Sequence, residues 1–175
     1  ILLTLIFLAG ASKVATGSSL LSDLHPKSSL YIDLKNVEHW FGGLLPMEII
    51  IEKDDNIDLP MHNKVIMGHV KDFQNQLNNM FPESNWISIQ RVLEEVLYEI
   101  DPNEKFPPDQ ETLDQINMLT QDQTQTLINF DEDKIRISGM LPDLSSDELD
   151  EARDSIILHT KQNFPEWLSV VVTGT

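Results

Sequence analysis

The clearest pattern in the chain lies near its C-terminus and predicts a strand, a helix and a second strand. Residues 133–141 alternate between apolar and polar side chains, which is the period of a strand with one buried face. The positions on the apolar side are Ile135, Ile137, Gly139 and Leu141. We therefore expect these four residues to face a hydrophobic core.

A helix should follow this strand. Ser145 and Glu148 have the spacing of a capping box, in which the two residues satisfy N–H groups at a helix start. One apolar face continues from there, formed by Leu149, Ala152, Ile156, Thr160 and Phe164. The helix should end near Pro165, since the residue before a proline avoids the helical conformation. The consecutive valines at 170–172 then predict a strand that is buried on both faces.

Earlier segments predict partners for these strands. Residues 47–53 indicate a first strand and residues 85–89 a short edge strand. Between them, a helix should begin at Pro60, which suits a first helical turn, and end before Pro82. Its predicted apolar face consists of Ile66, Val70, Phe73, Leu77 and Met80.

Two more helices are predicted at 92–100 and 109–127, separated by a proline-rich loop at 101–108. Their expected inward residues are Val92, Leu93, Val96, Leu97 and Ile100 in the first, and Leu113, Ile116, Leu119 and Leu127 in the second. They form a helical insertion at about 90–130 between two strand–helix–strand halves. This order predicts an α+β fold, a ferredoxin-like split βαβ sandwich, with the strands at Met47 and Lys134 side by side in its centre.

The N-terminal part divides into two regions. Residues 1–14 are almost uninterruptedly apolar but too few to span a bilayer alone, which takes about 20 residues. Three interpretations stay open: the end of a truncated transmembrane helix, which we prefer, a truncated signal sequence, or a buried core helix. Residues 15–45 are interpreted as a linker and a short amphipathic helix that ends at Gly42. The main domain then covers 46–175.

Composition removes several functional classes. The chain of 175 residues has a net charge of −17, which argues against binding nucleic acid or an anionic membrane surface through bulk charge. It contains no cysteine, so disulfides, zinc–thiolate sites and cysteine nucleophiles are excluded. Hydrophobic residues make up 41 % of the chain, as in a globular domain.

No motif predicts a catalytic, cofactor-binding or metal-binding residue. Among the five histidines, His62 and His69 fall on one predicted helix about 10 Å apart, too far to share a metal without another element. The acidic groups at 54–58 and 131–133 lack the spacing of a calcium loop and are interpreted as solvated turns. Neither a nucleophile-elbow motif nor a glycine-rich phosphate loop occurs.

Aromatic residues at element boundaries are the remaining candidates. They are Trp40 with Phe41, Trp86, and Trp167. The simpler interpretation is burial at the edge of the core. The alternative is a cleft for a hydrophobic ligand or a subunit contact.

Several short motifs follow one another in a distinctive order. Leu24, Pro26 and Ser29 precede Phe41-Gly42-Gly43, which precede the Pro46-x-Glu48 strand with its isoleucines at 49–51. Near the C-terminus come IRISGMLPD, S-x-x-E-L and V-T-G-T. Their order and spacing resemble MMPL-type exporters of the RND superfamily, in the segment that follows a first transmembrane helix.

This resemblance implies an extracytoplasmic porter domain with a ferredoxin-like core, on the periplasmic or extracellular side of the cell (inner) membrane. The parent would be a proton-driven secondary transporter that exports lipids or other hydrophobic substrates. The domain would be no enzyme and would need no cofactor; which residues line the substrate path is unknown. Its expected partners are the transmembrane helices and second porter domain of its own parent chain, the membrane and the substrate, with no nucleic acid.

Two other classes of function stay open. One is a tethered or secreted α+β module that binds a ligand or a partner. The other is a small ferredoxin-like hydrolase, which would need a convergent Arg/Asn or carboxylate site.

Overall fold

The computed structural model describes residues 19–124, 127–129 and 134–174. The predicted end of a membrane helix at 1–14 lies outside these residues. Within them, no helix is both long enough and apolar enough to cross a membrane.

The fold is α+β and is built on an antiparallel sheet. Its strands are β1 (Leu45–Lys53), β2 (Ile87–Ser88), β3 (Ile128–Asn129), β4 (Lys134–Leu141) and β5 (Leu168–Thr173). The order across the sheet is β2-β4-β1-β5, and β3 also pairs with β4. The predicted central pairing of the first strand with the strand at Lys134 is therefore confirmed.

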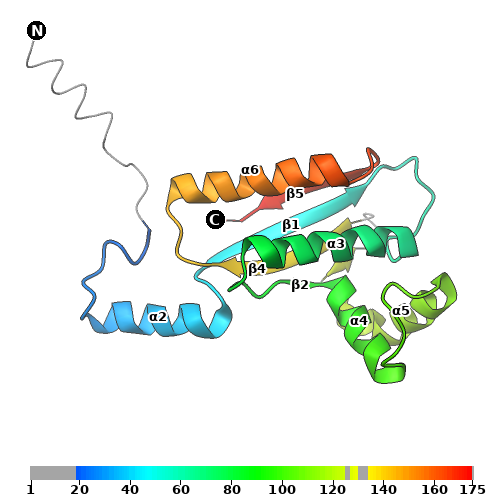
Figure 1. The fold of residues 1–175 in the computed structure, drawn as a ribbon, viewed down its shortest axis with the longest axis horizontal. Helices are drawn as coiled ribbons and strands as arrows, with labels where there is room; N and C mark the ends of the chain where they lie inside the picture. Colours follow the sequence, from blue (N-terminus) through cyan, green and yellow to red (C-terminus); the bar gives the residue numbers. More distant parts are fainter. Residues whose placement is uncertain (1–18, 125–126, 130–133, 175) are drawn as a thin grey trace, which may run out of the picture.

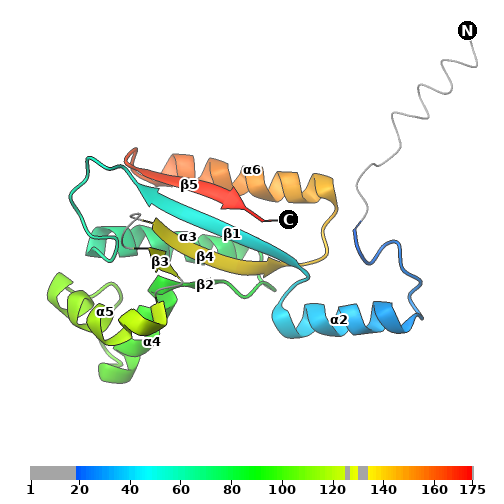
Figure 2. The same ribbon diagram turned by 180° about the vertical axis from the view of Figure 1, so that it is seen from behind.

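The helices of the described residues cover one face of this sheet. The long helices α3 (Lys64–Met80) and α6 (Ser146–Asn163) lie side by side on that face, while Figure 2 shows the opposite face bare. Helix α2 (Ser29–Phe41) stands at one end of the sheet (Figure 1). Helices α4 (Ile89–Ile100) and α5 (Gln110–Thr124) form a hairpin that projects beyond β2 (Figure 1).

The alternation predicted for β4 is present, and it builds the core. Ile135, Ile137 and Leu141 are fully buried under the helices. In the register of the sheet Ile137 lies opposite Ile49 of β1, which in turn lies opposite Val172 of β5. These three side chains point to the same face, because neighbouring residues across an antiparallel sheet share a face.

The other face of the sheet carries polar and charged side chains. Arg136 Nη2 lies 2.7 Å from Glu48 Oε1, and Lys134 Nζ lies 3.3 Å from Glu52 Oε1. These exposed ion pairs between β1 and β4 contribute little stability, since water and salt screen them. They mark this face as solvated.

The α4–α5 hairpin is attached to α3 by polar contacts. Lys71 Nζ lies 2.7 Å from Glu94 Oε1 and donates to the carbonyl oxygen of Phe106 at 3.3 Å. The backbone N–H of Lys64 donates to Gln110 Oε1 at 2.8 Å. The inner faces of both helices are buried, through Leu93, Leu97, Leu113 and Ile116.

Two predicted boundaries were wrong. Helix α3 begins at Lys64 rather than at Pro60, because the Asn63 side chain accepts the N–H of Val65 and caps the helix there. The helix predicted over 109–127 is shorter, since α5 ends at Thr124 and Leu127 packs against the core from outside it.

Three predicted burials were also wrong. Val171 of β5 is 44 % exposed, because β5 is an edge strand and no described helix covers the face to which Val171 points. Leu119 and Ile100 are exposed rather than inward. Both lie on the outer side of the α4–α5 hairpin, where no further described element covers them.

The predicted capping box at the start of α6 is present. Its contribution to the stability of the fold depends on pH. The Ser145 backbone N–H, and next its hydroxyl, hydrogen-bond the Glu148 carboxylate and hold its pKa below the usual value near 4.5. A carboxylate with a lowered folded-state pKa stabilises the fold above the unfolded pKa and loses that contribution as the pH falls through the folded pKa.

Replacing Glu148 with Gln should therefore reduce the dependence of stability on pH in the acidic range. The free energy of unfolding should depend less on pH below about 5 than in the wild type. Urea unfolding at a series of pH values measures this. An unchanged slope in Glu148→Gln, together with an unchanged slope in Ser145→Ala, would contradict the capping contribution.

Candidate functional site

The C-terminal end of α2 displays two aromatic side chains to solvent. The apolar positions of α2 recur every three or four residues as predicted, but none of its residues is buried. Trp40 is 71 % exposed and Phe41 58 % exposed. Gly42 ends the helix in the left-handed conformation, with φ of 77°.

The chain after α2 is held close to β4. A Cβ atom at Gly43 would lie only 2.1 Å from the carbonyl oxygen of Leu141, so the position accepts no side chain without a backbone shift. The N–H of Leu44 donates to the same carbonyl at 2.7 Å. This contact fixes the end of α2 against the end of β4.

Asp143, in the loop after β4, makes hydrogen bonds both to α2 and to the segment that precedes it. Asp143 accepts hydrogen bonds from the N–H groups of Leu20 and Leu21, at 2.8 and 2.7 Å. Its own N–H donates to Glu38 Oε1 at 3.0 Å. Glu38 also binds Lys35 Nζ at 2.6 Å, and this hydrogen bond raises the pKa of Lys35. The loop after β4 thus orients α2 relative to the sheet.

A hollow of about 500 Å³ opens beside the exposed aromatics, and we call it the Trp40 groove. Its apolar lining comes from four elements: Trp40 and Phe41 of α2, Ile87 of β2, Val92 of α4 and Met140 of β4. Arg91 and Glu95 of α4 stand at its polar side. A surface that gathers apolar side chains from four elements is suited to an apolar ligand or partner.

A second hollow continues along α4, and we call it the α4 groove. It measures about 830 Å³ and is lined by α4 and by Leu119 of α5. It shares Arg91, Val92 and Glu95 with the Trp40 groove. The two hollows therefore adjoin each other along α4.

The predicted aromatic candidates separate into two groups. Trp86 is 1 % exposed and packs against the core, and Trp167 is half-buried against it. For these two residues the simpler interpretation, burial at an element edge, is confirmed. Trp40 and Phe41 are exposed and line a groove instead.

Pattern analysis missed two groove residues. Ile87 and Met140 occupy the outward positions of their strands, opposite the core. Met140 is an apolar residue among polar ones on that side of β4, and this anomaly in the alternation is the signal that could have identified it.

The histidines form no common site. The prediction that His62 and His69 share one helix was wrong. His62 lies in the turn before α3, where its Nε2 lies 3.1 Å from Asp114 Oδ1. His69 and His159 contact Phe164 and Phe73 respectively, between α3 and α6. Among the described residues, no group of three or more His, Asp and Glu is placed to hold a metal ion.

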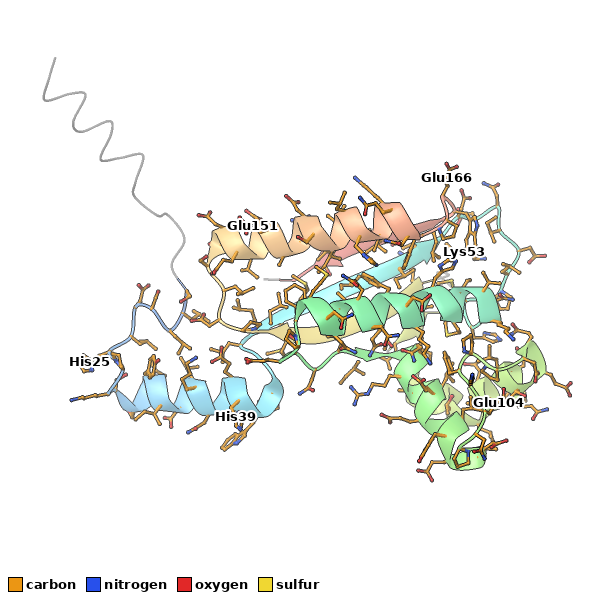
Figure 3. The ribbon with its side chains drawn as sticks, in the orientation of Figure 1. His25, His39, Lys53, Glu104, Glu151 and Glu166 are labelled. Atoms are coloured by element: carbon orange, nitrogen blue, oxygen red, sulfur yellow. The ribbon has the colours of Figure 1, made fainter. Side chains whose placement is uncertain are left out.

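The two remaining histidines and the acidic turns face solvent. His25 and His39 lie near the two ends of α2 and point outward (Figure 3). Asp54 accepts hydrogen bonds from the backbone and side chain of Asn56, as expected for a solvated turn. The other acidic group, at 131–133, lies outside the described residues.

Comparison of the chain with family models, with curated proteins and with solved structures gave no match.

Proposed function

We propose that this chain is the extracytoplasmic porter domain of a proton-driven membrane transporter of the RND superfamily, similar to the MMPL-type exporters. The observation that carries the proposal is the strand order β2-β4-β1-β5 with α3 and α6 on one face. This order is what two interleaved strand–helix–strand halves produce. It supports the domain type that the sequence resemblance implies.

The ferredoxin-like architecture is part of this proposal. One half is β1-α3-β2 and the other is β4-α6-β5, and the first strand of each half occupies the centre of the sheet. In this interpretation the α4–α5 hairpin is an insertion between the halves. Helix α2 would connect a membrane segment that includes residues 1–14 to the first strand.

The Trp40 groove is the proposed contact surface for hydrophobic cargo. Its lining is mostly apolar. Trp40 combines a large apolar ring with a polar N–H group, which suits a site where one end of the ligand is in contact with water. The domain would do no covalent chemistry. It would offer an apolar surface and move relative to its partner domain while access alternates between the two sides of the membrane.

The activity can be tested by efflux of the hydrophobic dye Nile red from cells that express or lack the parent protein. Expressing cells should retain less dye, and an uncoupler that abolishes the proton gradient should remove the difference. Equal retention in both strains, or a difference that the uncoupler leaves intact, would contradict proton-driven export of hydrophobic compounds.

Replacing Trp40 with Ala should reduce this efflux several-fold without unfolding the domain. The side chain is largely exposed, so the free energy of unfolding should change by no more than about 0.5 kcal/mol. Leu158→Ala is the matched control, because Leu158 is a large apolar residue that is also exposed, at 58 %, but lies on α6. Equal efflux in the two variants would show that the Trp40 groove does not contact the cargo.

The second candidate is a tethered or secreted binding module, and the same groove favours it. Such a module would bind an apolar ligand through Trp40 and Phe41 without any proton dependence. Loss of ligand binding in Trp40→Ala, with efflux unaffected by the parent protein, would favour this candidate.

A further inference from the structure

The outward face of α4 carries an apolar stripe along three helical turns. Val92, Val96 and Ile100 are four residues apart, so they lie one above another on the helix surface. Val92 and Val96 are half-buried, and Ile100 is 61 % exposed. Leu119 of α5, 72 % exposed, borders the stripe at its end. Four apolar residues thus line one side of a groove of about 830 Å³.

Carboxylates accompany this stripe. Glu95 and Glu99 are also four residues apart and line the same groove. Arg91 is the cation nearest to them along α4, and it is turned toward its own chain: Nε lies 3.3 Å from Glu95, and Nη1 donates to the carbonyl oxygen of Trp86 at 3.3 Å. The Glu99 side chain lines the groove, and its carboxylate makes no hydrogen bond or ion pair with another described residue. Of the acidic side chains that line the groove, Glu99 therefore carries the carboxylate that is not paired with a cation of the described residues.

The hairpin as a whole extends this negative field. Residues 89–124 contain nine Asp and Glu residues against two cations, Arg91 and Lys105. One of those carboxylates, Glu94, is engaged by Lys71 of α3. The excess of carboxylates makes the hairpin acidic as a whole, which attracts cationic groups and repels anionic ones.

We propose that the α4 groove binds an amphipathic α-helix of a partner protein, whose apolar residues are flanked by lysine or arginine. Helix α4 has 12 residues, which corresponds to a length of about 18 Å, so the groove fits a partner segment of about three turns. Apolar side chains of the partner at every third or fourth position would pack between Val92, Val96 and Ile100. Its cations would pair with Glu95 and Glu99.

Charge argues against two other occupants. A second copy of this chain also carries a net charge of −17, so two acidic surfaces would meet. An anionic lipid surface would be repelled for the same reason. The groove therefore recognises a partner helix by its positive charge together with its apolar stripe. This proposal does not rest on the transport function.

The test is calorimetric titration of the full 175-residue chain with a helical peptide of about 14 residues, built from leucine and lysine with leucines at every third or fourth position. A second peptide carries glutamate in place of every lysine. The leucine–lysine peptide should bind, and the leucine–glutamate peptide should not. Absence of binding by the cationic peptide, or equal binding by both, would overturn the proposal.

Variants of the chain locate the site. The double variant Glu95→Lys with Glu99→Lys should weaken binding at least tenfold, because it removes the charge contacts with the peptide. Ile100→Gln should weaken binding several-fold, because it interrupts the apolar stripe. The matched control is Glu151→Lys with Asp154→Lys, an equal charge change at exposed positions of α6; Glu151 lies on the far side of the molecule from the hairpin (Figure 3). It should weaken binding less than about twofold.

Two outcomes would contradict the assignment. Equal weakening in both double variants would show that bulk negative charge, and not the α4 groove, attracts the peptide. Sedimentation of the wild-type chain as a dimer, with Ile100→Gln sedimenting as a monomer, would show that a second copy occupies the groove. All three variants change exposed side chains, and circular dichroism checks that each retains the wild-type fold.

Discussion

Replacing Ile137 with Asp should unfold the domain. Ile137 is fully buried in β4, between Ile49 of β1 and Ser88 of β2. The buried residues that the structure describes include no Lys or Arg. A carboxylate at this position must therefore be buried as an unpaired charge or protonated, and either state is unfavourable. The expected loss exceeds about 4 kcal/mol, which is comparable to the whole stability of a small domain.

The matched control for this change is Val171→Asp. Val171 is also a β-branched residue of the sheet, but it is 44 % exposed on edge strand β5. Its replacement should cost about 1 kcal/mol. Thermal unfolding followed by circular dichroism compares the two variants. A folded Ile137→Asp chain, or equal destabilisation of the two, would show that the buried face of the sheet has been assigned incorrectly.

Replacing Gly139 with Ala should destabilise the domain by about 1–3 kcal/mol, although the same change usually strengthens a strand. A Cβ atom at Gly139 would lie 2.4 Å from Cε3 of Trp86, 2.6 Å from Cδ2 and 2.7 Å from Cζ3. Trp86 is 1 % exposed and contacts Phe81, so the ring has no free space to move into. The added methyl group therefore displaces the indole.

Gly68→Ala provides the opposite control. Gly68 lies inside α3, and a Cβ atom there would meet no atom within 4 Å beyond its chain neighbours and the backbone of its own helix. This replacement should stabilise the domain by about 0.5–1 kcal/mol, since alanine restricts the unfolded chain and favours a helix. Urea unfolding measures both changes. If Gly139→Ala were also stabilising, the packing of Trp86 over β4 would be refuted.

A double-mutant cycle isolates the contact. The cost of Gly139→Ala should fall when Trp86 is replaced by Leu, because the smaller side chain leaves room for the methyl group. Equal costs in the two backgrounds would mean that the strain arises elsewhere.

The elements with strong periodicity were predictable from the chain. The alternation at Ile135 and Ile137 and the Ser145–Glu148 capping box each depend on neighbouring residues, so local sequence contains the necessary information. The central pairing of β1 with β4 followed from the order of the elements. Gly42 ended α2 as expected, since glycine adopts a positive φ without strain.

The exposed residues were not predictable in the same way. The valines at 170–172 have the composition of a buried strand, but the burial of Val171 is decided by the place of β5 at the sheet edge. Leu119 and Ile100 fit the helical spacing of a core face, and only the position of the α4–α5 hairpin places them outside.

The Trp40 groove shows the same limitation for the candidate site. Trp40 was recognised as a candidate aromatic, but Ile87, Val92 and Met140 come from elements that are distant in the sequence. Their convergence depends on the pairing of β2 with β4 and on the close contact of Gly43 with Leu141. Tertiary structure, and not a motif, assembles the groove.

The most direct test of the proposed transporter is the nucleotide sequence of the parent reading frame on both sides of this chain. We expect an apolar segment upstream that completes a membrane span of about 20 residues with residues 1–14, and several further apolar segments of that length after residue 175. A stop codon shortly after residue 175, with no further apolar segment, would contradict the porter-domain proposal and leave the chain as a tethered binding module.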